Sequence, residues 1–460
     1  MARFLVCEYS QCRSAVYCFW QLLSKISMRY LYSLFVTLIL PFLWLLLCWR
    51  YRGTDYNQRW RERCGIVTAS DCTRPCLWIH TASVGEVIAA KKLVEHFIHY
   101  FSHYRVLITT TTPSGSQQVK SLFADNVRHC YLPYDLRYFF VRFLKLVKPV
   151  AVLIMETEMW PNMLAICHQS NIPSILINAR MSLRSCCNYR RLACLSESMF
   201  SQLTMVVAQT TADAKRLQYL GAKNISVSGN IKMDLGISAE QREKAKRLAV
   251  NWSNQGRRTV LIAASTHFGE DEKLLLALGK LRQSDLKILL VLVPRHPQRF
   301  EEVRQLSLQQ GYRVSRHSKD RVDESTDVVI GDTVGELMAM YGASDIAFVG
   351  GSLVDNGGHN MLEPAAWGLP VVTGSSVYNF SAIVDGLASA QGIRVVNNSR
   401  ELTENLLELG THPEIRYQMG AAASQYVESN KGSLKKLLGF LKPILDNLRS
   451  HEKYPSERLG

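Results

Sequence analysis

Short apolar runs alternate with longer amphipathic stretches along most of the chain. We predict strands at 77–80, 104–109, 150–155, 174–178, 205–208 and 225–228, and a second series at 259–264, 287–293, 327–330, 346–349, 370–373 and 393–396. Strands that alternate with helices form parallel sheets covered on both faces. Because the apolar pattern lapses between the two series, we expect a hinge near residues 232–240 between two doubly wound α/β domains. After Glu414 the chain is predicted to be helical to about Leu448.

One apolar run is too long for a buried strand. Tyr30–Trp49 carries no charge and has about the length needed to cross a bilayer. Five arginines between residues 50 and 63 should hold the downstream chain on the cytoplasmic side, although Lys25 and Arg29 precede the run. A tilted or interfacial anchor is the alternative to a full span. Residues 1–27 form an extension of uncertain status, and either Met1 or Met28 could be the start.

The composition and net charge of the chain limit the classes of partner that it is expected to bind. The 460 residues are 47% hydrophobic and carry a formal charge of +15, which favours anionic partners such as nucleic acid, an acidic membrane or phosphorylated substrates. Neither a zinc-finger spacing nor an RNA-binding aromatic signature is present, so we expect no nucleic acid. All twelve cysteines lie at or before Cys194 with irregular spacing, which indicates free thiols in a reducing compartment.

The stretch from Gly350 to Pro370, GGSLVDNGGHNMLEPAAWGLP, combines a glycine-rich turn with a helix start. We predict a helix from Met361 to Trp367 with Asn360 as its N-cap. Such a turn gathers free backbone N–H groups and the positive end of a helix dipole, which suits a phosphate. Glu363 would repel a phosphate but could accept hydrogen bonds from ribose hydroxyls. The stretch indicates a nucleotide site, and a capped helix with Glu363 on its dipole is the purely structural alternative.

Ligands of open parallel sheets bind beyond the carboxyl ends of strands, which selects further loops. Two prolines fix the loop 294–297 and direct Arg295, which suits a phosphate, although a solvated basic loop is the simpler explanation of one arginine. Residues 332–336 open another helix, where the backbone of Val334 and Gly335 could contact a base or a phosphate.

In the first domain, Ser83-Val84-Gly85-Glu86 is formally a capping box, in which Ser83 and Glu86 satisfy N–H groups of the following helix. However, Gly85 inside the first turn costs helix stability that a purely structural cap would avoid. If the segment is functional, Glu86 is the natural general base, because a carboxylate can take a proton from an attacking hydroxyl.

Three more charged residues later in the first domain are candidates. Glu156 and Glu158 follow an apolar strand and are expected to raise one another's pKa. Alternatively, both acids complement the dipole of a helix whose first turn contains Pro161. Lys232 lies at the expected hinge, where a cation could meet a departing phosphate, and an exposed lysine is the default alternative.

Several common signatures are absent. The chain contains no D-x-D triplet, so a pyrophosphate bridged by metal to two aspartates is not expected. The G-x-S-x-G and G-x-x-x-x-G-K-[ST] patterns of serine hydrolases and P-loop NTPases are missing as well. We therefore expect neither a metal nor another cofactor.

Nine motifs in order resemble those of the lipid A 3-deoxy-D-manno-octulosonic acid (Kdo) transferases. They are HTASVGE (80–86), LPYDL (132–136), LIMETEMWPN (153–162), INARMS (177–182), GNIKMD (229–234), STHFGE (265–270), VPRHPQRF (293–300), GDTVGELM (331–338) and FVGGSLVDNGGHNMLEPAAWGLPV (348–371). The resemblance runs from about Met28 to the C-terminal helix.

This resemblance implies a GT-B glycosyltransferase, an α/β protein with two doubly wound Rossmann-like domains facing a cleft and an N-terminal membrane-anchor helix. The implied parts are an extension at 1–27, an anchor at 28–52, an acceptor-binding domain at 53–235, a CMP-sugar-binding domain at 236–425, and a C-terminal helix with a basic tail at 426–460. The catalytic body is expected on the cytoplasmic face of the bacterial inner membrane.

The implied reaction moves Kdo, once or several times, from CMP-Kdo to the tetraacyl disaccharide precursor of lipid A (lipid IVA), with inversion at the anomeric carbon, in lipopolysaccharide core biosynthesis. Glu86 would be the base, and Glu156 and Lys232 would help to stabilise the transition state. The implied CMP-binding residues are Pro294, Arg295, Val334, Gly335, Glu336, Asn360, Met361, Leu362 and Glu363.

Two alternatives stay open. One is a GT-B transferase that uses a UDP-sugar and acts on a membrane lipid, and the other is a membrane-anchored binding protein without catalytic activity. The single phosphate of CMP agrees with the missing aspartate pair, which favours a CMP-sugar.

Overall fold

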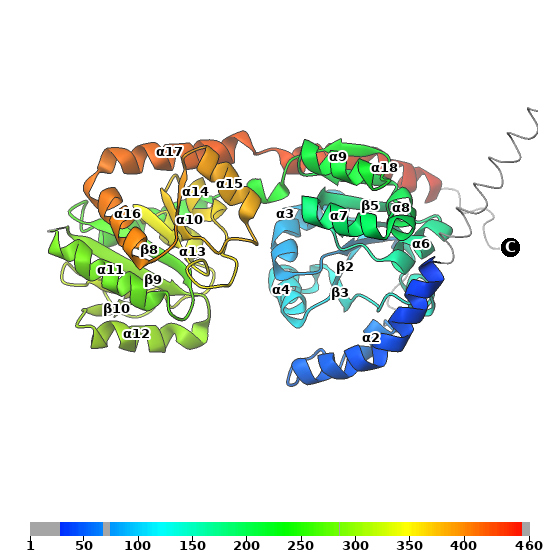
Figure 1. The fold of residues 1–460 in the computed structure, drawn as a ribbon, viewed down its shortest axis with the longest axis horizontal. Coiled ribbons are helices and arrows are strands. Elements are labelled where there is room, and N and C mark those ends of the chain that lie inside the picture. Colours follow the sequence, from blue (N-terminus) through cyan, green and yellow to red (C-terminus); the bar gives the residue numbers. More distant parts are fainter. Residues whose placement is uncertain (1–27, 68–73, 285, 453–460) are drawn as a thin grey trace, which may run out of the picture. The chain divides into compact units, whose positions relative to one another are not determined.

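The computed structural model describes residues 28–67, 74–284 and 286–452, which form two compact units (Figure 1). The first unit comprises the chain up to Lys232 together with the residues from Gly432 onward. The second unit comprises Met233–Lys431. The extension 1–27 and the end of the basic tail lie outside the described residues.

The first unit contains a seven-stranded parallel sheet in the order β3-β2-β1-β4-β5-β6-β7. Its strands are β1 (Cys76–His80), β2 (Arg105–Thr110), β3 (Arg128–Tyr131), β4 (Pro149–Met155), β5 (Ser174–Ala179), β6 (Met205–Ala208) and β7 (Ile225–Val227). Its helices, besides Met28–Arg50, are α2 (Trp60–Arg63), α3 (Val84–Tyr100), α4 (Pro113–Phe123), α5 (Arg137–Val147), α6 (Pro161–Gln169), α7 (Leu183–Arg191), α8 (Ala193–Ser201), α9 (Thr211–Tyr219) and α18 (Ser433–Glu452), with short 3₁₀ turns η1 (Ala124–Asn126) and η2 (Ile231–Met233).

The second unit repeats this design with the strand order β10-β11-β9-β8-β12-β13-β14, again all parallel. Its strands are β8 (Thr259–Thr266), β9 (Ile288–Pro294), β10 (Val314–Arg316), β11 (Val328–Ile330), β12 (Ile346–Val349), β13 (Val371–Gly374) and β14 (Ile393–Val396). Its helices are α10 (Ala239–Trp252), α11 (Asp271–Gln283), α12 (Phe300–Gln309), α13 (Leu337–Tyr341), α14 (Leu362–Ala366), α15 (Ser381–Ser389), α16 (Ser399–Thr411) and α17 (Pro413–Ser429), with η3 (Pro297–Arg299).

The two sheets confirm the predicted pair of doubly wound α/β domains. Central strands such as β9 are buried along their whole length, because helices cover both faces of a parallel sheet. All twelve predicted strands are present, but β3 and β10 were missed. Both lie at an edge of their sheet and carry polar residues among few apolar ones, so they lack the continuous apolar run of a central strand.

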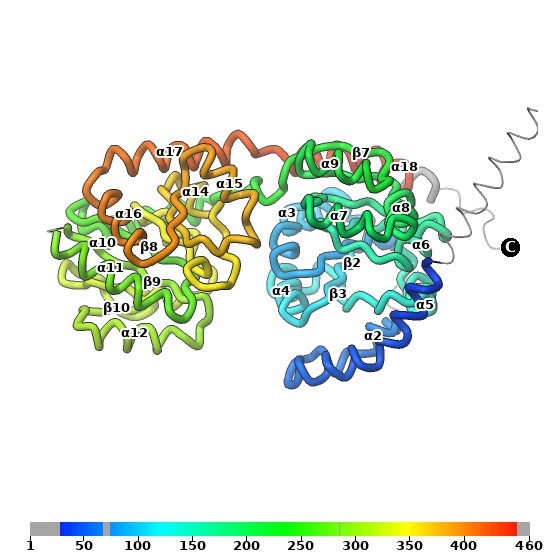
Figure 2. The backbone as a smooth tube through the Cα atoms, viewed as in Figure 1, coloured from blue at the N-terminus to red at the C-terminus, as the bar shows by residue number. Residues whose placement is uncertain are grey.

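The last helix belongs to the first unit. Leu437, Leu441 and Leu445 of α18 are buried in one core cluster with residues of α3 and of β1, β2, β4 and β5. Tyr104 also donates a hydrogen bond from its hydroxyl to the Leu445 carbonyl at 3.3 Å. The chain therefore leaves the first unit near Lys232 and returns to it after α17 (Figure 2).

The predicted continuous C-terminal helix is wrong in one respect. The structure divides it into α17 and α18, and the chain between them passes through Gly432 at a φ of 89°. A residue in this left-handed conformation cannot continue a right-handed helix, and glycine adopts it without steric strain.

The helix Met28–Arg50 is the one helix in the described residues that is long and apolar enough to cross a membrane. Many of its large apolar side chains are exposed, Phe42 and Trp49 among them. Near its start, Ser33 accepts a hydrogen bond from the side-chain amide of Asn162 at 3.0 Å, which ties the helix to α6.

We predict that Leu441→Ala destabilises the first unit by about 2–5 kcal/mol, since it removes a fully buried side chain from the core under α18. Lys442→Ala, which truncates an exposed neighbour on the same helix, should leave stability within about 0.5 kcal/mol. Urea unfolding combined with hydrogen exchange should show faster exchange in β1, β2 and β4. Faster exchange confined to the second unit would contradict this placement of α18.

Candidate functional site

Three candidate residues of the first unit come together at the carboxyl edge of its sheet. Glu86 lies in the first turn of α3 after β1, Glu156 follows β4 directly, and Lys232 lies in η2. The Lys232 ammonium donates to the Glu156 carboxylate at 2.6 Å. The charge of Glu156 also acts on Glu86 and raises its pKa. The neighbouring positions of β1 and β4 in the sheet explain why segments so far apart in the chain meet.

Glu86 is buried, with 8% of its surface exposed, and it holds the loop before α3. One of its carboxylate oxygens accepts the backbone N–H of Ala82 at 2.8 Å, and the Ser83 hydroxyl donates to the other at 3.2 Å. Ser83 is the N-cap, as predicted, but the backbone N–H that the Glu86 carboxylate accepts is that of Ala82 and not that of Ser83. Burial, with a further contribution from Glu156, raises the pKa of Glu86 to about 8.

The expectation that Glu156 and Glu158 raise one another's pKa is not met. Burial is the cause of the raised pKa of Glu158, and the repulsion from both acids acts on Glu86 instead. Pro161 is the first residue of α6, as predicted, but neither acid lies in the first turn of that helix. The alternative in which these acids merely complement the dipole of α6 is therefore wrong.

The backbone at this edge is strained. Glu156 has a φ of 56° and Asn178, near the end of β5, has a φ of 50°. Non-glycine residues rarely adopt this left-handed conformation, and such residues are concentrated at functional sites. The side-chain oxygen of Asn178 accepts the N–H of Ile231 at 3.1 Å, so that Asn178 helps to position the turn that carries Lys232.

In the second unit, the predicted glycine-rich stretch forms a turn around a buried glutamate. Glu363 lies in the first turn of α14, and Asn360 donates to its carboxylate at 3.1 Å. Burial raises the pKa of Glu363, while the charge of Arg295 acts in the opposite direction. The predicted N-cap is wrong by one residue: Met361 precedes the first helical residue, and the Asn360 side chain accepts the N–H of Leu362 at 3.2 Å.

The loop 332–336 differs from the expectation in how Glu336 is used. Its carboxylate accepts hydrogen bonds from Lys244, from His317 at 2.9 Å and from Thr333 at 2.8 Å. Burial alone would raise the pKa of Glu336, but these bonds lower it to about 2. Because this carboxylate is occupied, the loop can offer a ligand the backbone of Val334 and Gly335, while Glu336 fixes the loop.

One buried acid that the sequence reasoning did not single out connects the loops of the second unit. Glu270 is fully buried and accepts backbone N–H groups from His267 at 2.9 Å, Gly351 at 2.7 Å, Ser352 at 3.0 Å and Leu353 at 2.9 Å. It thereby ties the loop after β8 to the loop after β12. The sequence feature that could have indicated this role is an acidic residue at the N-cap of α11, directly after a strand-end loop.

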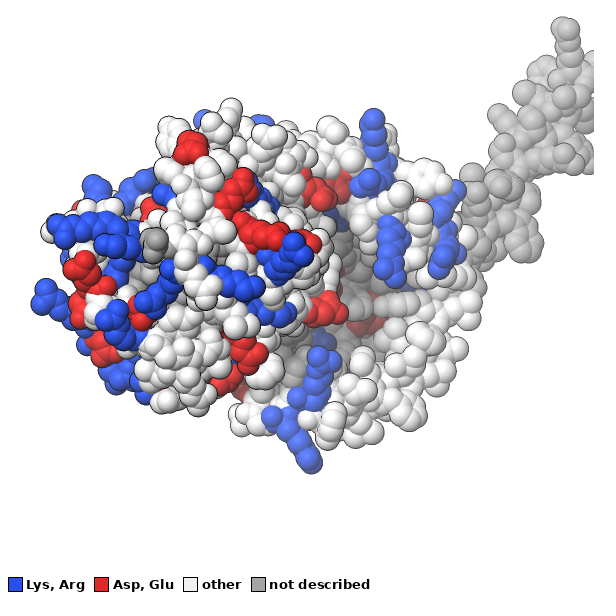
Figure 3. Space-filling model, turned by 60° about the vertical axis from the view of Figure 1, so that its left-hand side comes forward, with Lys and Arg blue, Asp and Glu red and all other residues white. Residues whose placement is uncertain are grey.

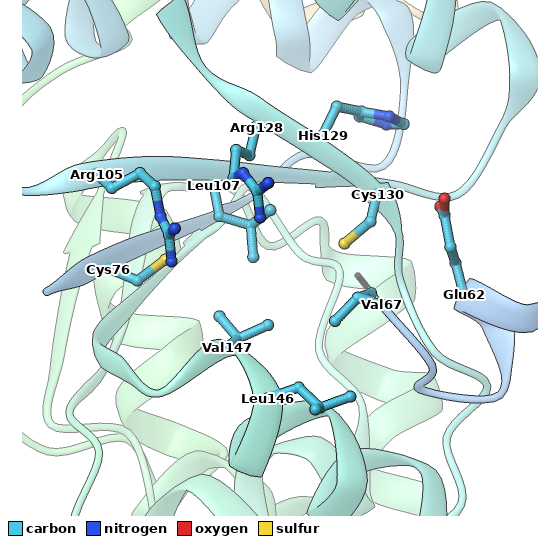
Figure 4. Close-up of a pocket in the computed structure, with 10 residues that line it drawn as sticks. All are labelled: Glu62, Val67, Cys76, Arg105, Leu107, Arg128, His129, Cys130, Leu146 and Val147. Carbon is cyan, nitrogen blue, oxygen red and sulfur yellow. The ribbon is translucent and has the colours of Figure 1, made fainter. Parts of the chain in front are cut away.

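The predicted site residues are marked neither by the cavity shown in Figure 4 nor by surface charge. A cavity of about 230 Å³ in the first unit is lined by residues that include Cys76, Arg105 and Arg128, the first residues of β1, β2 and β3 (Figure 4). None of the predicted site residues lines it. On the face shown in Figure 3, Lys and Arg side chains lie interspersed with acidic ones over the part at the left, so charge singles out no ligand site there. Within the described ranges, no three His, Cys, Asp or Glu side chains are placed to hold a metal ion.

Comparison with solved structures supports the fold. A glycosyltransferase from Rickettsia africae superposes with a TM-score of 0.52 over 82% of this chain and 100% of that one, at 13% identity. A UDP-N-acetylglucosamine 2-epimerase from Neisseria meningitidis gives a TM-score of 0.53 over 80% of this chain and 100% of that one, at 14% identity. These neighbours agree with the predicted GT-B class of two-domain α/β proteins.

Sequence comparison is more specific. The family described as 3-deoxy-D-manno-octulosonic-acid transferase (kdotransferase) matches residues 58–235. A protein of Haemophilus influenzae named 3-deoxy-D-manno-octulosonic acid transferase is 41% identical over 414 residues, which is 89% of this chain and 96% of that protein. The Bordetella pertussis protein of the same name is 32% identical over 91% of this chain and 99% of its own length. With this identity over nearly the whole length, the chain belongs to the 3-deoxy-D-manno-octulosonic acid (Kdo) transferase family.

Proposed function

We propose that this Kdo transferase moves Kdo from CMP-Kdo to the tetraacyl disaccharide precursor of lipid A on the cytoplasmic face of the bacterial inner membrane, with inversion at the anomeric carbon. Family membership supports Kdo transfer in lipopolysaccharide biosynthesis. The observation that carries the catalytic assignment is the cluster of Glu86, Glu156 and Lys232 at one sheet edge.

Glu86 acts as the general base in this proposal. Its carboxylate takes the proton of an acceptor hydroxyl while the hydroxyl oxygen attacks the anomeric carbon of Kdo. The bond from that carbon to the CMP phosphate breaks, and CMP leaves with the electron pair. Attack opposite the leaving group inverts the configuration, and no intermediate bonded to the protein is needed.

The pKa of Glu86 suits this task. A general base works best when its pKa lies near the working pH, because it must be ionised and still hold a proton firmly. At about 8, the pKa of Glu86 meets that condition, whereas an exposed glutamate would be a far weaker base. The charge of Glu156 raises the pKa of Glu86 further and so makes the base stronger, and Lys232 forms an ion pair with Glu156.

Lys232 and Glu156 have a second role in the proposal. As CMP departs, negative charge grows on its phosphate, and a fixed ammonium group stabilises such charge. Glu156 orients this ammonium through the bond of 2.6 Å. Removal of either residue should therefore slow the chemical step more than it weakens substrate binding.

The second unit holds the nucleotide in this proposal. Glu363 accepts the ribose hydroxyls, with Asn360 positioning its carboxylate, and Arg295 pairs with the phosphate. The guanidinium of Arg295 forms no hydrogen bond or ion pair with another described residue, so it is available to a ligand. The backbone of Val334, Gly335, Met361 and Leu362 and the ring of Pro294 complete the site, and Glu336 fixes its loop.

The helix Met28–Arg50 supports an acceptor that lies in a membrane. Its exposed apolar length matches a bilayer, and Arg50, Arg52 and Arg59 follow or end it, a pattern typical of a cytoplasmic flank. Anchoring restricts the search for a lipid acceptor to the membrane plane. The excess of basic side chains also suits the phosphates of such a lipid.

Replacing the proposed base should abolish transfer. We predict that Glu86→Gln and Glu86→Ala lower kcat by at least about 100-fold, which is the lower end of what a general base contributes. CMP affinity should stay unchanged, since the nucleotide is assigned to the other unit. Glu95→Gln, at an exposed acid on the same helix, is the matched control and should keep full activity. Near-normal turnover of both Glu86 variants would rule out this base.

The pH dependence follows from the raised pKa of Glu86. The active base is the ionised form, so kcat/KM should rise with pH and level off above an apparent pKa of about 8. Glu156→Gln removes a negative charge next to Glu86, which lowers the pKa of Glu86. The rise of kcat/KM with pH should therefore occur at lower pH in this variant, although its maximal rate is lower. Initial rates with CMP-Kdo across the neutral to alkaline range measure the shift. An apparent pKa that is unchanged or higher in the Glu156→Gln variant would contradict the effect of Glu156 on Glu86.

A thermal shift assay separates CMP-sugars from UDP-sugars. CMP should raise Tm, with a stabilisation of about 2.7 kcal/mol at 100 times its Kd, whereas UDP should have little effect. Glu363→Gln should reduce the response to CMP, because the ribose hydroxyls lose one of the two acceptor oxygens at residue 363. Stabilisation by UDP and not by CMP would instead favour the UDP-sugar alternative.

A further inference from the structure

Three histidines of the second unit gather at the carboxyl ends of three different strands. His267 follows β8, His296 follows β9, and His359 lies in the glycine-rich stretch after β12. The Nε2 atoms of His267 and His359 lie 2.9 Å apart, and their rings are nearly parallel with centroids 5.1 Å apart. The ring of His296 meets that of His267 edge-on at 5.5 Å.

The fold holds these rings in place. Glu270 accepts the backbone N–H of both His267 and Gly351, so that one buried carboxylate fixes the two loops that carry His267 and His359. Gly351 has a φ of 68°, and a Cβ on it would lie 2.9 Å from a ring carbon of His359. A side chain at residue 351 would therefore displace the imidazole pair, which explains the need for glycine there.

Hydrogen-bond donors outnumber acceptors in this cluster. The nearby acids are already engaged, since Glu270 accepts four backbone N–H groups and Glu363 accepts from Asn360. Arg295 adds a guanidinium without a protein partner among the described residues. Burial, then the charges of Arg295, His267 and His296, lowers the pKa of His359 to about 4. The cluster thus lacks an anion that a ligand would bring.

The chemistry of Kdo places a second anion beside the first. As an octulosonic acid joined through its keto carbon, Kdo carries its carboxyl group on the same carbon that bears the CMP phosphate. A group that binds this carboxylate must therefore lie next to the group that binds the phosphate. The charge of Arg295 is among those that lower the pKa of His359, so the guanidinium and this imidazole lie near one another.

We propose that His267 and His359, with His296 beside them, form a carboxylate subsite that recognises the acidic group of the transferred sugar. The proposal rests on the function proposed above, with Arg295 on the donor phosphate. The two Nε2 atoms share one hydrogen bond with each other. A neutral imidazole can carry its proton on either nitrogen, so both Nε2 atoms can donate to an entering carboxylate that replaces this bond.

This subsite would make the enzyme selective for acidic sugars. A neutral sugar nucleotide offers the imidazoles no carboxylate, so it gains nothing from the subsite. Hydrogen bonds to charged groups contribute about 1.5–3 kcal/mol each, which corresponds to roughly 10-fold to 150-fold in affinity. The alternative is that the imidazoles only pack against each other and shape the loop.

Calorimetry on the full chain in detergent can test the subsite with three ligands: CMP, a hydrolysis-resistant CMP-Kdo analogue with a free carboxylate, and the methyl ester of that analogue. Wild-type protein should bind the acid at least about 10-fold more tightly than the ester, because the ester carries no charge for the imidazoles. The His267→Gln/His359→Gln variant should bind acid and ester equally and bind CMP as the wild type does. His412→Gln, at an exposed histidine of the same unit, should behave like the wild type.

Each other result counts against the subsite. Equal wild-type affinity for acid and ester would overturn it without any variant, so the test survives a variant that does not fold. A variant that loses CMP and the acid to the same extent would show that the histidines only shape the loop. Wild-type protein that binds neither CMP nor the analogue would refute the proposed donor, and the subsite with it.

Discussion

Buried carboxylates that accept backbone N–H groups hold the strand-end loops of both units. Glu270 accepts four such groups in the second unit, and Asp135 accepts two at the start of α6 in the first. A loop beyond the end of a strand has no neighbouring strand to satisfy its N–H groups, and leaving them buried without a partner is costly. An ionised acid with two oxygens satisfies several at once. The geometry of the proposed site depends on these hydrogen bonds between buried carboxylates and backbone N–H groups.

Glu86, the proposed base, is held by the same kind of contact. Like Glu270 it accepts a backbone N–H beside a strand end, but it has fewer donors and two acids nearby. Donors stabilise an ionised carboxylate, whereas burial and like charge oppose ionisation. For Glu86 the opposing effects win, and the carboxyl is poised to exchange a proton near neutral pH.

The sequence allowed prediction of the central strands, the two-domain fold class and the segments that carry the site. It could not show that Lys232 bonds to Glu156, because that contact depends on the order of strands in the sheet, and a parallel order leaves no local pattern. For the same reason, the sequence led us to expect an effect of Glu156 on the pKa of its neighbour Glu158, whereas the structure shows an effect on the pKa of Glu86. Edge strands β3 and β10 were not predicted because they mix polar and apolar residues. The packing of α18 against the first unit was not predicted either, because the pattern of an amphipathic helix does not show which domain its apolar face contacts.

The return of α18 to the first unit has a consequence for biosynthesis. On the ribosome, the nascent chain exposes the helix Met28–Arg50 and the whole first sheet long before Ser433 is made. The second unit is contiguous in sequence and can complete its core while the first still lacks a covering helix. Synthesis from the N-terminus thus leaves an apolar surface of the first unit uncovered until α18 has been made, and such surfaces are prone to association. Premature termination before Gly432 would yield a polypeptide prone to aggregation even with every residue of the proposed active site present.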